Sequence, residues 1–201
     1  IAIGGSGASG AVTAGFSDGA VKHITVATTG STHFTTSAFA QSGTSSTIKL
    51  AASDSQPDDF YNGMRINIYT GTGYGNTGII ADYVASTKTC SVVKENGTAG
   101  WDVWVNSGLS SATTFDTTSG YEIEPRVVLS GGGSPTRDAL ARAVVDNQQI
   151  SKIYILDGGA GYTSAPTITI TDPNASTVGT ATSEIGDGVI SQTTVGTAGS
   201  G

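Results

Sequence analysis

The chain is poor in charge, and its few charges are mostly acidic. Charged residues occupy 12% of the 201 positions, about half the usual share. With 16 acidic and 9 basic side chains, the formal net charge is −7. Nucleic-acid binding needs a basic face that neutralises phosphates, so we expect no nucleic-acid partner. No stretch approaches the ~18 uncharged apolar residues of a membrane-spanning helix, so we expect no membrane insertion.

Cysteine and histidine are almost absent. The single cysteine, Cys90, cannot form a disulfide within the chain. The two histidines form no Cys/His cluster of the kind that holds structural zinc. Stability must therefore come from burial, from backbone pairing or from association between copies.

Small residues and strand formers are abundant instead. The chain holds 29 Gly, 24 Ser and 30 Thr residues, and its apolar 37% is rich in Val, Ile and Tyr. β-branched and aromatic residues favour strands, and glycine favours tight turns. The composition therefore predicts an all-β fold of short strands.

Internal repeats are the most informative feature of the sequence. Residues 120–129 and 161–170 both read G-Y-x-x-x-P-x-[IV]-x-[IL], 41 positions apart. Three further segments match one another in the same way, as do two glycine-rich stretches and two Asp-Gly pairs. These matches join 21–26 with 150–155 and 190–195, 159–161 with 199–201, and 18–19 with 187–188.

The matches imply a unit of about 40 residues, which the chain both enters and leaves part-way. We therefore expect a window from a longer array, with each unit forming a short β meander or a β-sandwich module. Residues 167–171 alternate apolar and polar side chains, as half-buried strands do. Pro166 precedes them at a position where its missing N–H is tolerated.

Residues 134–142 give the one conflicting local signal. Ser134 and Pro135 are typical of a helix start, and good helix formers follow them. The repeat, however, aligns 141–145 with the Thr-rich residues 181–185, which are poor helix material. A strand is favoured here, and a short helix is the alternative.

A stretch of about 90 residues between Gly30 and Gly120 does not match the unit. Asn62-Gly63 within it is a hairpin signal. We predict three parts: a partial β repeat at 1–43, an inserted β module at 44–119, and truncated GY-x3-P repeats at 120–201. The strands predicted in the module are residues 46–51, 64–70, 78–84, 89–94 and 101–105.

Residues 153–170, with the pattern GxGYTSAPT, resemble a repeat of virion structural proteins from tailed bacteriophages, especially those of cyanobacterial hosts. Residues 58–68 and 79–83 resemble a β module common in the same proteins. Gly30-Ser31-Thr32-His33-Phe34 departs from the repeat where Gly-x-Gly-Tyr is expected.

The resemblance implies a non-enzymatic tail, baseplate or fibre subunit located in the virion. Its partners would be other virion proteins and further copies of itself, for example in a trimer, and it implies no catalytic residues. Related repeats also occur in bacterial surface proteins. A bacterial extracellular adhesin or filament subunit is therefore an alternative, as is a host-surface glycan-binding module.

Several residues are of types that can act as catalytic groups, but their patterns do not favour a catalytic site. Glu122 and Glu124 are two apart on a predicted strand, at a separation that glycoside hydrolysis uses. They occupy variable positions of the repeat. We therefore expect them to lie on a solvated strand face rather than to form the catalytic pair of a polysaccharide depolymerase. Glu95 and Asp102 are a second carboxylate pair. His23 and His33 have no recognisable nucleophile beside them.

Ligand-binding patterns are equally weak, and we expect no cofactor and no metal. The Gly-rich residues 71–78 lack the following helix that a dinucleotide loop needs, so a hairpin loop is favoured. Asp54, Asp58, Asp59 and Asn62 offer oxygens but match no calcium-loop spacing, which favours a solvated turn.

Four aromatic residues of the inserted module suggest a glycan contact. An exposed aromatic face could stack on a sugar ring of the host surface. Two of the four are tryptophans three positions apart, which would face opposite sides of a strand. The core or a subunit interface is therefore favoured for both. The four residues are Trp101, Trp104, Tyr74 and Tyr83.

Overall fold

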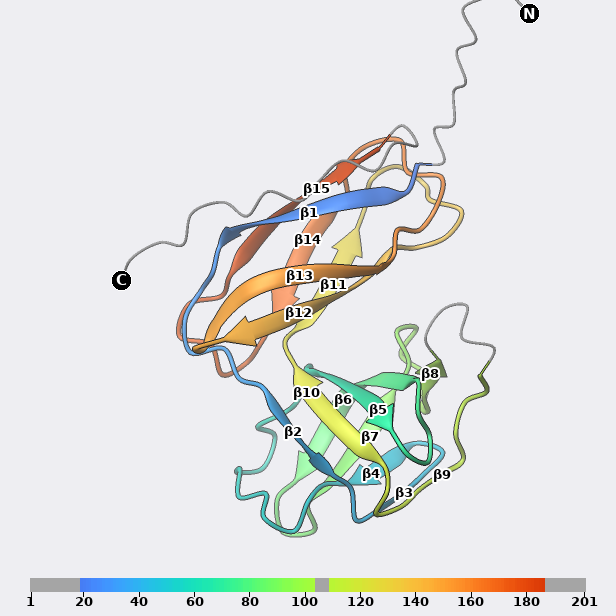
Figure 1. Ribbon diagram of the computed structural model, residues 1–201, viewed down its shortest axis with the longest axis vertical. Coiled ribbons are helices and arrows are strands. Elements are labelled where there is room, and N and C mark those ends of the chain that lie inside the picture. The colour runs from blue at the N-terminus through green and yellow to red at the C-terminus, as the bar shows by residue number, and fades with distance from the viewer. Residues whose placement is uncertain (1–18, 104–108, 187–201) are drawn as a thin grey trace, which may run out of the picture.

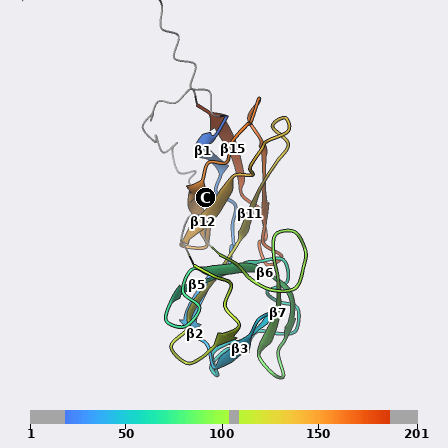
Figure 2. The ribbon, with the colours of Figure 1, turned by 90° about the vertical axis from the view of Figure 1, so that its right-hand side faces the viewer.

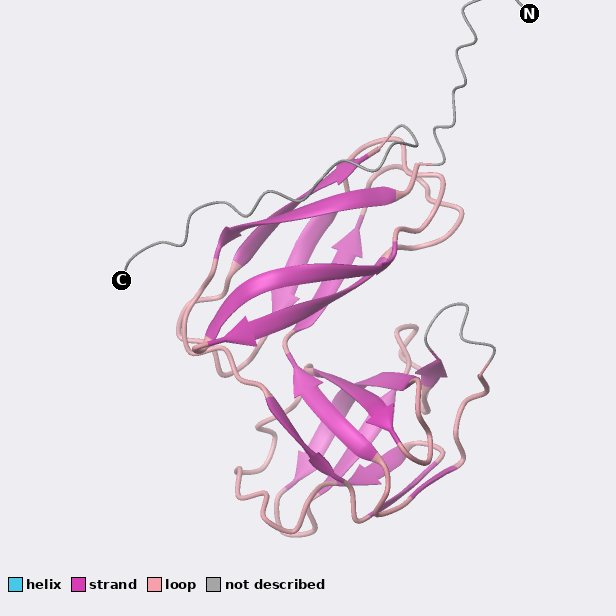
Figure 3. Ribbon diagram, viewed as in Figure 1, coloured by secondary structure: helices cyan, strands magenta, loops and turns pink. Residues whose placement is uncertain are grey.

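The computed structural model describes residues 19–103 and 109–186 (Figure 1). These residues form strands and no helix, which confirms the all-β fold (Figure 3). It follows that no described segment is an apolar helix long enough to cross a membrane. The strands gather into two units that lie end to end along the long axis (Figures 1 and 2).

The terminal unit combines the two ends of the described chain. It consists of three antiparallel strand pairs, β1 with β15, β11 with β14 and β12 with β13. Neighbouring pairs pack side by side, β14 on β15, β11 on β12 and β13 on β1, so the six strands close a ring. The strands are β1 (Val21–Thr28), β11 (Arg126–Ser130), β12 (Leu140–Asp146), β13 (Gln149–Asp157), β14 (Thr167–Thr171) and β15 (Thr180–Ile185).

Alternating apolar side chains fill this ring. The core takes every second residue of β11 and β12, as period-two patterning requires, whereas a bulge near one end of β1 and of β13 shifts the pattern by one residue, and Tyr162 covers the core from a loop. Its buried members are Val21, Ile24, Val127, Leu129, Ala141, Ala143, Ile150, Ile153, Tyr162 and Ile170.

Segments that match in sequence occupy equivalent places in the terminal unit. β11 pairs with its own counterpart β14, Val127 opposite Ile170. The β12–β13 pair and the β15–β1 pair follow the same register, with Arg142 opposite Tyr154 and Thr182 opposite Thr25. Both pairs also carry register shifts at the same two relative positions.

Two glycines occupy equivalent turns in the two halves. Gly30 and Gly159 both have a φ of +67°, a left-handed conformation that other residues adopt at a cost. A Cβ on Gly159 would lie 2.6 Å from the carbonyl oxygen of Arg137, and one on Gly30 would lie 2.5 Å from that of Thr177. Arg137 and Thr177 are 40 residues apart in the sequence.

The conflict at residues 134–142 is resolved in favour of a strand. Residues from Leu140 onward form β12, and Arg137 makes a backbone bridge to Ala160. Ala141 and Ala143 point into the core, while their neighbours along the strand are only partly buried. Burial at every second residue, together with pairing to β13, outweighs the local helix signal.

The central unit is a nine-stranded antiparallel sheet. Its strand order is β2-β10-β5-β6-β7-β4-β3-β9, with β8 pairing β6 beside this path. The strands are β2 (Thr36–Phe39), β3 (Ser42–Thr44), β4 (Thr47–Lys49), β5 (Arg65–Thr70), β6 (Asn76–Val84), β7 (Thr89–Val93), β8 (Asp102–Val103), β9 (Thr114–Phe115) and β10 (Gly120–Glu124).

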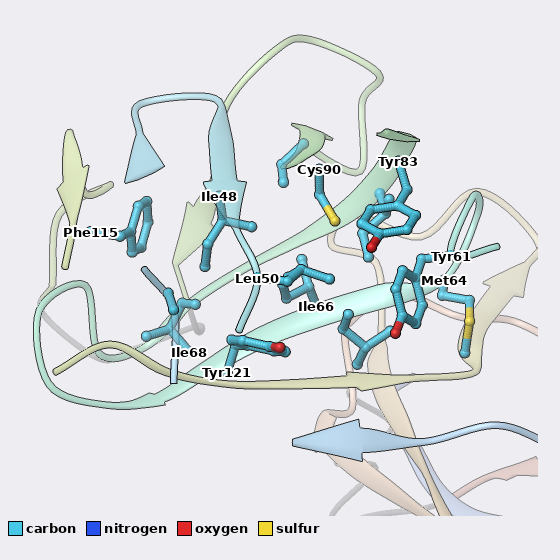
Figure 4. Close-up of a cluster of buried hydrophobic side chains, with 14 of the residues drawn as sticks. Ile48, Leu50, Tyr61, Met64, Ile66, Ile68, Tyr83, Cys90, Phe115 and Tyr121 are labelled. Carbon is cyan, nitrogen blue, oxygen red and sulfur yellow. The ribbon is translucent and has the colours of Figure 1, made fainter. Parts of the chain in front are cut away.

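The core of the central unit is rich in isoleucine and tyrosine. Figure 4 shows the rings of Tyr61 and Tyr83 beside one another, with Ile66 and Tyr121 nearby. The two tyrosine rings meet edge to face, with centroids 4.9 Å apart. Edge-to-face contact adds to the energy of burial, so this end of the sheet is well packed.

The predicted boundaries of the inserted module were too narrow. The sheet extends from Thr36 in β2 to Glu124 in β10, beyond the expected 44–119. Gly120-Tyr121 matches the repeat motif, but Tyr121 is buried in the central core and β10 pairs with β2 and β5. Because the Gly-Tyr motif occurs in both units, the sequence did not show that β10 belongs to the central unit.

The turn signals had mixed outcomes. Residues 85–88 connect β6 to β7 in a tight hairpin. Asn62-Gly63 lies in a turn ahead of β5 and joins no two paired strands.

The predicted strand 101–105 is observed as β8, and residues 104 and 105 lie outside the described residues.

Replacement of Gly159 by Ala should destabilise the protein more than replacement of Gly131. Both glycines have positive φ, so each variant pays about 1 kcal/mol of backbone strain. Only Gly159 adds a clash with backbone, because nothing lies within 4 Å of a Cβ on Gly131. The free energy of unfolding in urea measures the difference. Equal losses would show that packing at Gly159 contributes nothing.

Candidate functional site at the junction of the two units

The chain crosses between the units twice. Residues 29–35 lead from β1 to β2, and Pro125 alone separates β10 from β11. Proline has a fixed φ, which makes the second crossing stiff. Side chains from both units gather around these crossings, so the junction is the most elaborate polar site among the described residues.

Arg142 of β12 holds two carboxylates of β10. Its Nη2 donates to Glu122 Oε2 at 2.7 Å and to Glu124 Oε2 at 2.5 Å, and its Nε donates to Glu124 at 3.1 Å. Asn67 of β5 donates to the other oxygen of Glu124 at 2.9 Å. The Glu124 side chain is 1% exposed, whereas Arg142 and Glu122 keep about a quarter to a third of their surface, so only the Glu124 carboxylate is shielded from solvent.

Burial raises the pKa of Glu124 to about 7, even though Arg142 opposes the shift. Burial lowers the pKa of Arg142, but the charges of Glu124 and Glu122 outweigh it, and the net shift is upward. The raised pKa of Glu124 decides its charge state, because the side chain is buried and two carboxylates share one guanidinium, which leaves one negative charge in excess.

A second cluster links the units through Glu95. Arg126 of β11 donates from Nη2 to Glu95 Oε2 at 2.7 Å, and Arg65 of β5 pairs with Oε1 of the same carboxylate. The backbone N–H of Glu95 donates to Asp102 Oδ2 at 2.8 Å. Glu95 is thus a bridge between two arginines from different units.

His33 holds the first crossing in place through buried hydrogen bonds. Its Nδ1 lies 3.0 Å from Asp172 Oδ2, and Gly179 N–H donates to its Nε2 at 3.1 Å. An accepting Nε2 leaves the proton on Nδ1, facing the carboxylate. Phe34 N–H also donates to Asp172 Oδ2, at 2.9 Å. Both side chains of the His33–Asp172 pair are fully buried.

His33 stands where the other half of the terminal unit has Tyr162. The Tyr162 hydroxyl accepts from Ala139 N–H at 2.9 Å, as His33 accepts from Gly179 N–H. Ala139 and Gly179 are 40 residues apart. The departure from the Gly-x-Gly-Tyr pattern therefore replaces one hydrogen-bonded ring by another.

The prediction of a solvated face for Glu122 and Glu124 was wrong. The two residues do share one face of β10, but β12 of the terminal unit covers that face and Arg142 binds both. The other candidate pair, Glu95 and Asp102, is likewise bound by arginines and backbone. The side chain of His23 lies outside the described residues.

The acidic stretch was expected to be a solvated turn, which the structure contradicts for Asp54. Its carboxylate accepts from Tyr61 Oη at 2.5 Å and from the Tyr83 hydroxyl. Burial and the Asp54 charge raise the pKa of both tyrosines, so their hydroxyls stay protonated as donors. Asp58 accepts from Ala85 N–H at 2.6 Å. These oxygens are thus engaged by the protein itself.

Asp54 also borders a shallow pocket of about 200 Å³ in the central unit. The pocket is lined by small polar groups and by the rings of Phe34, Tyr61 and Tyr121. Burial raises the pKa of Tyr121 to about 12, so this hydroxyl is also protonated at neutral pH. Within the described residues, no group of three or more His, Cys, Asp or Glu side chains is placed to hold a metal ion.

The glycine-rich residues 71–75 form the hairpin loop between β5 and β6, as favoured from the sequence. Of the four aromatic candidates, Trp101 and Tyr83 are buried and Tyr74 is 50% exposed. Trp104 lies outside the described residues. The sequence did not single out Phe39 and Tyr69, which are exposed on the outer face of β2 and β5.

Comparison with known proteins gives no relative. No protein-family model matches the chain, and neither a curated protein nor a solved structure matches it.

Replacement of Arg142 by Met should cost about 3 kcal/mol of unfolding free energy at pH 8, because Glu124 would remain buried without its cation. The double variant R142M/E124Q should recover most of that loss, since the orphaned charge is then removed. Urea unfolding of the two single variants and the double variant measures the coupling. Strictly additive losses would contradict the ion-pair account.

Stability should fall as the pH rises from about 4.5 to about 7. The pKa of Glu124 is raised from 4.5 to about 7 on folding, so between these values the folded protein holds a proton that the unfolded chain has released. We expect the free energy of unfolding to be about 2 kcal/mol lower at pH 8 than at pH 5.5. E124Q is the control and should lose this difference. A difference that persists in E124Q would assign it to other groups.

Proposed function

We propose that this protein is a non-enzymatic structural subunit of a phage virion, in the tail, baseplate or a fibre, that acts by assembling with copies of itself and with other virion proteins. The junction is the observation that carries the proposal. Two chain crossings and two ion-pair clusters join the units, so relative rotation must break the pairing of Arg142 with the buried Glu124 and that of Arg126 with Glu95. Separating a buried pair costs several kcal/mol. Such a junction suits a part that holds its shape within a particle.

Exposed apolar side chains support assembly. Tyr154 and Leu156 lie on the outer face of β13 with 49% and 46% of their surface exposed, and Phe39 of β2 is 55% exposed. Apolar surface that gathers in one place commonly marks a protein–protein contact, and Tyr154 and Leu156 are two positions apart on the same strand, whereas Phe39 belongs to the central unit. A homo-oligomer such as a trimer would cover these residues.

The resemblance of residues 153–170 to phage repeats supports the virion over a cell surface. The same repeat type makes a bacterial adhesin or filament subunit the competing proposal. A glycan-binding role would rest on Tyr74, Phe39 and Tyr69, the exposed aromatics of the central unit. These rings offer stacking faces, and none of them lines the pocket beside Asp54.

Antibody-labelled electron microscopy of the native source material tests the proposal. Antibodies raised against the purified chain should label tails, baseplates or fibres of phage particles. Antibody absorbed beforehand with the purified chain is the control and should label nothing. Label on cell surfaces or free filaments would reject the virion role and favour the adhesin or filament subunit.

A further inference from the structure

β2 is an edge strand of the central sheet. It pairs with β10 on its inner side, and no described strand pairs with its outer side (Figure 1). Ala40 N–H donates to Ser119 O, toward β10. In an antiparallel pair, the backbone groups of alternate residues point to opposite sides of the strand. The N–H and C=O groups of Ser37 and Phe39 therefore point to the outer side, away from β10.

The outer side is covered by the chain itself only as far as Gln41. Gln41 N–H donates to Lys49 O at 2.9 Å, on the side away from β10. The chain after β4 then diverges from β2, and Ala51 N–H donates to the Tyr121 hydroxyl at 3.2 Å instead. Two residues of β2 thus keep outward backbone groups that the sheet does not use.

The pocket beside Asp54 lies where the chain diverges. Residues 36–38 of β2 line one side of it, and residues between 51 and 56 line the other. Three aromatic rings complete the lining, those of Phe34, Tyr61 and Tyr121. The pocket volume of about 200 Å³ is below the range of about 300–1,000 Å³ that is typical of small-molecule sites. The pocket therefore suits one side chain of an extended segment better than a free ligand.

Asp54 makes the pocket acidic. It is the only charged residue among the described residues that line the pocket, and Lys88, which donates to its backbone oxygen, does not line it. Within the described part of the chain, Oδ1 accepts from Tyr83 and from Gln56 N–H, whereas Oδ2 accepts from Tyr61 alone. Each carboxylate oxygen offers about two acceptor positions, so Oδ2 has room for one more donor.

A strand added beside β2 would direct one side chain into this pocket. Residues directly opposite one another on paired strands point to the same face of the sheet. Ala38 packs against the core and lines the pocket, so the residue opposite Ala38 would also face the pocket. Its two neighbours would bond to Ser37 and Phe39 through the backbone. A cationic side chain at the central position would meet both the Asp54 carboxylate and the aromatic rings, which attract cations.

We propose that the outer edge of β2 binds an extended peptide segment of a partner protein as an added antiparallel strand, with a basic side chain of that segment in the pocket beside Asp54. In strand addition of this kind, backbone hydrogen bonds supply affinity and side-chain pockets supply specificity. The net charge of −7 also favours the approach of a basic segment. This inference does not depend on the proposed virion role.

Synthetic peptides test the charge preference of the site. The probe is fluorescein-TVTKTVT-amide, in which the central lysine shares one strand face with the two valines. Its binding to the full chain is measured by fluorescence polarisation at low salt. The matched peptide TVTETVT, with glutamate in place of lysine, should bind at least about tenfold more weakly, because it brings a second carboxylate to Asp54.

Backbone methylation of the same peptide tests the strand pairing. The N–H groups of the two threonines beside the lysine would face β2, so N-methylation of either should abolish binding. The N–H of the lysine would face away from β2, and its methylation is the matched control that should retain most of the affinity. Both changes add the same methyl group, so only their direction differs.

Three variants of the full chain test the site from the protein side. S37P removes an outward N–H without removing a bond to β10, since proline is tolerated in edge strands, and should abolish binding. D54N should weaken binding about tenfold. D59N is its matched control, because Asp59 is exposed in the following turn and does not line the pocket. Urea unfolding establishes that each variant is folded.

Amide hydrogen exchange followed by NMR locates the peptide. The N–H groups of Ser37 and Phe39 should exchange rapidly in the free chain and at least about tenfold more slowly with the lysine peptide bound. The N–H of Ala38, which faces β10, should be protected in both states.

Four outcomes would overturn the proposal. One is no binding of the lysine peptide at millimolar concentration, and another is equal binding of the lysine and glutamate peptides. A third is equal loss in D54N and D59N. The fourth is binding that survives N-methylation of both threonines, which would show that the peptide does not pair with β2 and which decides the matter even where S37P fails to fold.

Discussion

The closure of the terminal ring by β1 is the constraint on which the rest of the molecule depends. β11 to β15 follow one another in the chain, but the place beside β15 and β13 is taken by a strand from about a hundred residues earlier. The segment between β1 and β11 must therefore leave the terminal unit and return to it. This segment forms the central unit, and polar contacts hold it at the two crossings between the units.

The anchoring is electrostatic and partly buried. Glu124, His33 and Asp172 are buried, and each is bonded to a residue distant in the sequence. Buried charges add little net stability when paired, but they cost much when separated. Such pairs specify one arrangement of the two units rather than strengthening either unit alone. The excess carboxylate at Arg142 then makes this arrangement sensitive to protons near neutrality.

The sequence predicted much of the fold, because strand patterning is a local property. Residues 167–171 alternate visibly, and the matched register of β12–β13 and β15–β1 follows from the aligned segments. The assignment of β10 failed because Gly120-Tyr121 looks the same in either unit. Only its pairing with β2 and β5, which is not local, decides the matter.

The junction could not be predicted, since each contact joins residues far apart in the chain. Arg142 lies 18 positions from Glu124, and His33 lies 139 positions from Asp172. One signal was available: His33 interrupts a motif that elsewhere has tyrosine. A residue type that departs from its repeat marks a place where the surroundings have changed, but it does not reveal the new partner.

The pairing of Val21 with Ile185 has a mechanical consequence. The polypeptide enters β1 and leaves β15 at the same end of the terminal unit, with the two backbones in contact. Tension applied between the start of β1 and the end of β15 would act on the first hydrogen bond between these strands. The strands would then separate one residue pair at a time. A particle that used this protein would therefore need to transmit force through the faces of its units rather than along the covalent chain.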